Sequence, residues 1–166
     1  MLYRVIAYLR FLFTATNQHG VHSPFVYKYI TQGVYGKPDV NASKTTNVLL
    51  KSMVYFKVTR LLWESNDMDA KQKVLNKFQN LDFGPPPFDL IYIHDPGVEM
   101  QRVFKKKNVH NDTVVLIENI HGSKKNLALW NTLKNKPYIT VSIDMFYCGA
   151  LFFRKEQAKE HFRIRI

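Results

Sequence analysis

The sequence predicts an α/β protein whose core is a mostly parallel β-sheet with helices on both faces and an antiparallel C-terminal end. Helix-like and strand-like patterns alternate along residues 46–135, as they do in chains that form parallel sheets. Two apolar runs, "FDLIYIHD" and "DTVVLIENI", have the composition of strands buried on both faces. Three strand patterns then close the chain without room for crossover helices, so we expect hairpins there.

A helical extension is expected over residues 1–36, ahead of an α/β domain over residues 37–166. Apolar side chains recur at helical spacing along residues 1–16, where Arg4 and Arg10 interrupt the run. Ser23 and Pro24 are suited to cap and begin a second helix. His19 and His22 flank this junction without a nearby cysteine or carboxylate, so we expect them to pack rather than to bind a metal.

The remaining elements follow from the same patterns. A polar loop is expected over residues 33–47. Helices are expected over residues 46–56, 67–81 (capped by Asp67 or Asp69), 100–107 and 124–135. Strands are expected over residues 58–65, 88–95, 112–120, 138–146, 149–155 and 161–166. The first two of the closing strands should pair antiparallel, with Gly149 at the bend and with Phe146, Leu151 and Phe153 in the core.

Composition and charge narrow the classes of partner. The chain has 166 residues, of which 46% are hydrophobic, so one domain with one core is expected. A net charge of +11 attracts phosphate groups, which keeps a nucleic-acid partner open as an alternative. The single cysteine, Cys148, excludes an internal disulfide and favours a reducing, cytoplasmic compartment. No run reaches the roughly 20 apolar residues of a membrane span, although the basic first helix is also compatible with a membrane surface.

Polar residues follow three of the apolar runs, in "WESND", "IHDPG" and "IENIHG". Ligands of open α/β sheets bind at the carboxyl ends of parallel strands. The candidate site residues at this edge are therefore Glu64, His94, Asp95, Glu118 and Asn119, with His94 and Asp95 as the catalytic candidates. Asp95, Glu118 and Asn119 carry oxygen ligands suited to a divalent cation, but we favour ordinary polar strand ends and expect no metal.

Two motifs carry a resemblance to a known family. "HGVHSPFV" begins at His19, and the chain closes with "HNDTVVLIENI" and "ITVSIDMFYCGALFFRKEQAKEHFRIRI". In these stretches the sequence resembles bacterial class I S-adenosylmethionine-dependent methyltransferases, over residues 1–60 and 86–166. The resemblance implies a Rossmann-like sheet and S-adenosylmethionine as the cofactor, with Glu64, Asp95 and Glu118 at the positions that would bind it.

The chain departs from the family between these stretches. The family's first strand ends in an acidic, glycine-rich loop, because the backbone there passes close to the cofactor. Here the matching segment reads "LLWESNDMDAKQ" and contains no glycine. The family also has two more strand–helix units, one of which supplies the acid that holds the cofactor ribose. Only one helix fits between Trp63 and Phe88, so both units are missing.

We therefore expect a shortened, methyltransferase-like protein that is non-catalytic. The alternatives are an active, reduced methyltransferase that completes its site by dimerisation, and a basic nucleic-acid-binding module. Loss of two strands should leave the apolar strand around Leu61, Leu62 and Trp63 at the edge of the sheet. A homodimer or a protein partner is expected to cover this edge or the first helix.

Overall fold

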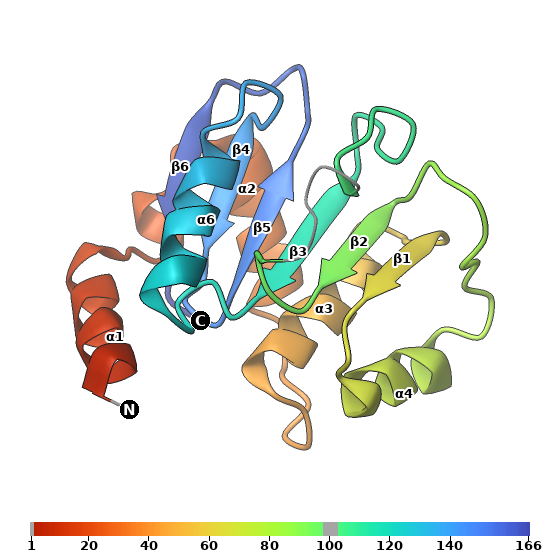
Figure 1. Ribbon diagram of the computed structural model, residues 1–166, viewed down its shortest axis with the longest axis horizontal. Coiled ribbons are helices and arrows are strands. Elements are labelled where there is room, and N and C mark those ends of the chain that lie inside the picture. The colour runs from red at the N-terminus through yellow and green to blue at the C-terminus, as the bar shows by residue number, and fades with distance from the viewer. Residues whose placement is uncertain (1, 98–102) are drawn as a thin grey trace.

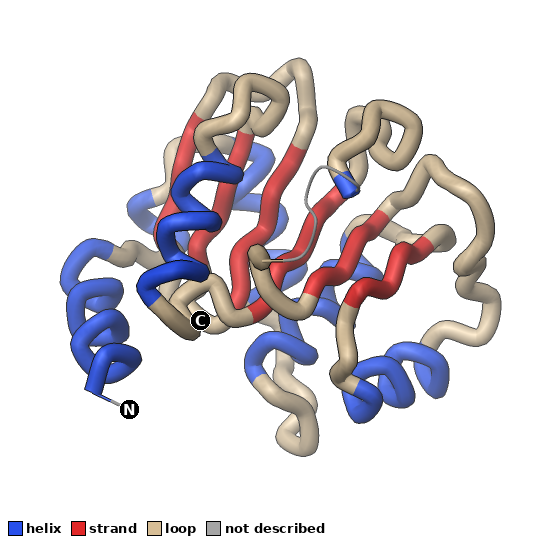
Figure 2. Tube along the Cα trace, in the orientation of Figure 1, coloured by secondary structure: helices blue, strands red, loops and turns tan. Residues whose placement is uncertain are grey.

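The computed structural model describes residues 2–97 and 103–166, which fold into a six-stranded sheet with helices on both faces (Figures 1 and 2). The order of the strands in this sheet is β1-β2-β3-β5-β4-β6. In chain order the strands are β1 (Leu61–Glu64), β2 (Leu90–Ile93), β3 (Val114–Glu118), β4 (Val141–Asp144), β5 (Cys148–Phe152) and β6 (Glu160–Arg163). The α/β class and the position of β1 at an edge of the sheet are both as the sequence predicts.

The strand directions confirm the prediction of a mostly parallel sheet, but they differ from the prediction for the C-terminal strands. β1, β2 and β3 are parallel to one another, whereas β5 is antiparallel to both β3 and β4. The expectation of antiparallel pairing for the last strand is wrong, because β6 pairs with β4 in parallel. The cause is the direction of β5, which ends at Phe152, opposite the first residue of β4, Val141. β6 begins at Glu160, on the other side of Val141. The connection over residues 153–159 therefore crosses only one strand and needs no helix.

The β4–β5 pairing is antiparallel, as expected, but Gly149 does not form the bend. Gly149 lies inside β5 and faces Asp144 of β4. The bend is at Phe146, whose φ is 65°. A Cβ atom on Gly149 would lie 2.5 Å from the Trp130 ring, so glycine is required here by packing rather than by turn geometry. Phe146, Leu151 and Phe153 are buried, as the sequence predicts.

Helices cover the two faces of the sheet with separate apolar clusters. On one face lie α2 (Pro24–Lys28), the π-helix η2 (Tyr29–Val34), α3 (Lys44–Tyr55) and α4 (Met68–Lys77). On the other face α6 (Lys124–Lys134) packs Trp130 and Leu133 against the sheet (Figure 1). The residues over 24–34 thus belong to the main core, and the domain boundary at residue 36 stays a prediction.

Helix α1 (Leu2–Thr14) packs outside both of these clusters, beside α6 (Figure 1). Its buried residues Ala7 and Phe11 form a third cluster with Ala15 and Phe146. The segment after α1 is held by β6, since the Thr16 amide donates to the Arg163 carbonyl at 2.9 Å. None of the helices in the described residues has the length and apolar composition needed to traverse a bilayer.

Side-chain caps set where several helices begin. Ser23 accepts a hydrogen bond from the Val26 amide and Pro24 is the first residue of α2, as predicted. Asp67, rather than Asp69, caps α4. That helix ends at Lys77 instead of continuing to residue 81. The helix expected over residues 100–107 lies partly outside the described residues.

Candidate functional site

The carboxyl edge of the parallel strands brings two of the predicted site residues together. His94 Nδ1 lies 2.9 Å from Oε2 of Glu118, at the ends of the adjacent strands β2 and β3. Tyr92 donates a hydrogen bond to the other carboxylate oxygen of Glu118. Tyr92 and Glu118 are buried, whereas 45% of the His94 side chain is exposed. The result is a buried carboxyl group connected to solvent through an imidazole ring.

The pKa of Glu118 suits it to proton transfer. Burial, and then the negative charge of Asp67, raise this pKa from 4.5 to about 7. A carboxyl group that titrates near neutral pH can act as either a general acid or a general base. Tyr92 donates to Oε1, so Oε2 is the carboxylate oxygen that faces His94 and can exchange a proton with it. The pair can therefore pass a proton between the buried end of β3 and solvent.

Sequence analysis did not identify Tyr92 as a site residue. It lies inside an apolar run and is the third of the four residues of β2. The signal was the two-residue period of a strand, which places Tyr92 and His94 on the same face. The two side chains therefore reach the same carboxylate.

Glu64, Asp95 and Asn119 occupy the same edge in other roles. Glu64 ends β1, and its carbonyl accepts a hydrogen bond from the His94 amide at 3.1 Å. Asp95 Oδ1 accepts the Gly97 amide at 2.6 Å and shapes the turn after β2. Asn119 has a φ of 52° and its amide donates to the Tyr147 carbonyl at 3.0 Å, a conformation that asparagine tolerates. Within the described residues, no group of three or more His, Cys, Asp or Glu side chains is placed to hold a metal ion.

The polar groups of the turn between β1 and α4 form hydrogen bonds with one another and with the start of α4. Trp63 Nε1 donates to the Ser65 carbonyl at 2.7 Å, and the Asp67 amide donates to Ser65 Oγ at 3.1 Å. The Asp67 carboxylate then accepts the Ala70 amide at 2.9 Å, at the amino end of α4. A helix amino end attracts anions, but here a side-chain carboxylate of the protein already occupies it. Every residue of the turn also carries a Cβ atom, so a ligand has no glycine backbone to approach.

A second polar pair lies where β3 and β4 end. His121 Nε2 is 2.8 Å and 3.0 Å from the two carboxylate oxygens of Asp144, and both side chains are buried. The His121 ring stacks on Phe146 at 4.8 Å and meets the edge of Phe11 at 5.9 Å. Sequence analysis did not predict this pair. The available signal was that Asp144, like Glu118, is the polar end of an apolar parallel strand.

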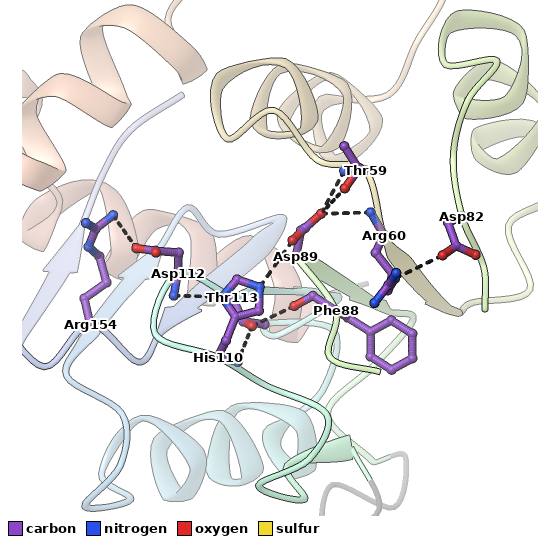
Figure 3. Close-up of polar contacts among 9 residues, drawn as sticks. All are labelled: Thr59, Arg60, Asp82, Phe88, Asp89, His110, Asp112, Thr113 and Arg154. Atoms are coloured by element: carbon purple, nitrogen blue, oxygen red, sulfur yellow. Dashed lines mark hydrogen bonds and ion pairs between the residues drawn. The ribbon is translucent and has the colours of Figure 1, made fainter. Parts of the chain in front are cut away.

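The polar network in Figure 3 lies at the opposite, amino-terminal edge of the sheet. Asp89 Oδ2 accepts three hydrogen bonds of 2.8 Å, from the Thr59 amide, the Thr59 hydroxyl and the Arg60 amide. Its Oδ1 lies 3.2 Å from His110 Nε2. Burial acts to raise the pKa of Asp89, but these hydrogen bonds outweigh it and lower the pKa below its ordinary value. The network joins the segments that lead into β1, β2 and β3, which is a structural role.

Comparisons with known proteins identified no relative of this chain. A scan against protein-family models found no match, and searches of curated proteins and of solved structures found none either. The resemblance to methyltransferases therefore rests on the sequence motifs alone. Functional inference must come from the residues and their geometry.

Proposed function

We propose that this chain is a reduced, Rossmann-like methyltransferase relative that does not bind S-adenosylmethionine and works in the cytoplasm as a binding module rather than as an enzyme. The observation that carries the proposal is the turn between β1 and α4, where side chains and a capping carboxylate take the place of glycines. The two sequence motifs supply the relationship to the family. The single cysteine, Cys148, supports a reducing compartment.

The edge position of β1 supports the same conclusion. Among the described residues β1 is the last strand on its side of the sheet, so within them no strand beyond it supplies an acid for the cofactor ribose. Each lost hydrogen bond to a charged group costs about 1.5–3 kcal/mol. Losing the close backbone approach and the ribose acid together would move a micromolar dissociation constant toward roughly millimolar, a difference of about 4 kcal/mol.

One observation favours the second candidate function, a reduced but active methyltransferase. Glu118, with its pKa of about 7, contacts a half-exposed His94, which is a suitable arrangement for a general base. In such an enzyme the pair would take the proton that the acceptor loses as it receives the methyl group. Glu64, Asp95 and Glu118 would lie on the cofactor, and a second subunit would complete the edge beside β1.

Calorimetric titration of the full chain with S-adenosylmethionine and with S-adenosylhomocysteine separates these two candidates. The binding-module proposal predicts no saturable heat below about 1 mM ligand. It also predicts no change in melting temperature at that concentration, since only a bound ligand stabilises the native state. Saturation at micromolar concentration would contradict the proposal. Loss of that binding in Glu118→Gln, but not in the surface variant Asp69→Asn, would then assign the cofactor to the carboxyl edge.

A further inference from the structure

A cavity of about 500 Å³ lies between α1, α6 and the end of β6. Helix α1 contributes one face to it, including Tyr3, Ile6 and Arg10, while α6 contributes Lys124 and Leu127. His121 lines it from the turn after β3. Cavities of roughly 300–1,000 Å³ are the usual size of small-molecule sites in proteins. The volume is therefore sufficient for a small organic ligand.

Two of the residues that line this cavity carry buried polar atoms without a hydrogen-bond partner. Within the described residues, the buried side-chain atoms that lack a hydrogen-bond partner are Tyr3 Oη and His121 Nδ1, and both residues line the cavity. Buried polar atoms in folded proteins almost always have partners, so each exception needs an explanation. His121 is only 6% exposed and its Nε2 is bonded to Asp144, which leaves Nδ1 for a group that the protein itself does not supply.

The charge of the cavity determines which kind of group would fit. Arg10, Lys124 and Arg163 line it, and its described lining residues include no carboxylate. Asp144 lies behind His121, where it also meets Arg163 Nε at 3.9 Å. A concave surface with several cations attracts an anion. The remaining lining residues are apolar, namely Leu2, Ile6, Ala7, Phe11 and Leu127, and they match a ligand whose body is hydrocarbon.

We infer that this cavity binds a small amphipathic anion, with a carboxylate or phosphate monoester head and an apolar body. The Tyr3 hydroxyl donates a hydrogen bond to a head oxygen, and His121 Nδ1 shares one proton with another head oxygen. Asp144 accepts the Nε2 hydrogen of His121 and so fixes the orientation of the ring. Arg10, Lys124 and Arg163 balance the charge of the head, while the body lies along the apolar side chains of α1 and α6.

The inference is independent of the proposed function. The cavity is lined by none of the cofactor candidates Glu64, Asp95 and Glu118. A failure to bind S-adenosylmethionine therefore says nothing about this cavity, and a failure to bind an amphipathic anion leaves the proposed function unaffected.

The test is calorimetry of the full chain with octanoate, octyl phosphate and the neutral control 1-octanol, each kept in monomeric form. We expect saturable binding of octanoate, octyl phosphate or both, and at least about tenfold weaker binding of 1-octanol, because it lacks the charged head. The comparison of octanoate with octyl phosphate shows which head the cavity prefers. Inorganic phosphate, which lacks the apolar body, should also bind at least about tenfold more weakly than octyl phosphate.

Two conservative variants assign the binding to this cavity. Tyr3→Phe removes only the hydroxyl and should weaken anion binding about tenfold. Lys124→Ala should weaken it as well, whereas Lys125→Ala, a change at the next residue of α6 and outside the cavity lining, should leave it unchanged. The inference is overturned if neither octyl anion saturates or if 1-octanol binds as well as they do. Equal effects of Lys124→Ala and Lys125→Ala would overturn it too.

Discussion

His94 Nδ1 lies 2.9 Å from Glu118 Oε2. Burial raises the pKa of this Glu118 carboxyl group from 4.5 to about 7. The folded protein therefore holds the Glu118 proton more tightly than the unfolded chain does. This carboxyl group contributes stability that is fully present below pH 4.5 and is lost as the pH rises toward 7. Above pH 7 the buried carboxylate is a net cost to the fold.

Glu118→Gln should remove this pH dependence, because glutamine keeps the shape of the side chain but does not ionise. Between pH 4.5 and pH 7, the free energy of unfolding of the native protein should fall relative to that of the variant by an amount on the order of 3 kcal/mol. Urea unfolding measured at several pH values supplies the comparison. Parallel stability profiles of the two proteins would show that Glu118 has an ordinary pKa.

Asp89→Asn should destabilise the amino-terminal edge of the sheet, since an amide accepts the hydrogen bonds of this network less strongly than a carboxylate. We expect a loss of about 1.5–3 kcal/mol in the free energy of unfolding at neutral pH. The matched control is Asp82→Asn, whose exposed ion pair with Arg60 (Figure 3) should contribute less than about 1 kcal/mol. Equal losses in the two variants would argue against the structural role of Asp89.

The effect of Asp89 should also depend on pH. Its pKa is lower in the folded protein than its ordinary value of 3.8, so its contribution to stability is present above pH 3.8 and is lost as the pH falls through the lowered pKa. The difference between native protein and Asp89→Asn should therefore narrow in acid. If the difference in free energy of unfolding between the two proteins stays constant down to the acid unfolding transition, the prediction is contradicted.

We predict a homodimer that buries either the outer edge of β1 or the outer face of α1. Asp82 forms a parallel bridge with Arg60, just before β1, but Phe83 and Leu75 beside that strand are 44% and 41% exposed. On α1, Leu9 is 50% and Phe13 is 89% exposed. Light scattering at high micromolar concentration should give twice the mass of the 19.5 kDa chain. A monomer would mean that residues 67–87 are sufficient to cover the edge.

Two charged substitutions then locate the interface. Leu9→Glu should dissociate a dimer that forms through α1, whereas Phe83→Glu should dissociate one that forms beside β1. Both positions are already partly exposed in the single chain, so neither change buries a charge within the monomer. A dimer that survives both substitutions would exclude both surfaces.

Local signals in the sequence were sufficient to predict the six strands and some of the helix starts, although α3 begins at Lys44 rather than at residue 46. Ser23 caps α2 as predicted, and Asp67, one of the two predicted candidates, caps α4, because a cap needs only its neighbours in the chain. The position of β6 was not predictable in this way. Its apolar residues would suit a place beside β4 or beside β5, and the choice between them depends on strand directions that are set by long-range pairing.

In the candidate site, too, some residues could be predicted from local sequence signals and others could not. Glu118 and His94 were expected at the same edge of the sheet, because each lies at the carboxyl end of a parallel strand. The His121–Asp144 pair was not predicted, because β5 lies between β3 and β4 in the sheet. The turns that follow these two strands contain Asn119 and Phe146, both of which have positive φ angles. The apolar pattern of a strand gives no information on the conformation of the turn that follows it.

The hydrogen bonds between the segment after α1 and β6 give the molecule an order of assembly during translation. The Thr16 amide donates to the Arg163 carbonyl, and the Arg165 amide donates to the Thr16 carbonyl at 3.0 Å. Thr16 leaves the ribosome almost 150 residues before these arginines, so the two hydrogen bonds can form only after β6 has been synthesised. Because Arg163 also lines the cavity behind α1, that cavity is complete only when synthesis has passed β6, and its occupancy by a ligand would report that point.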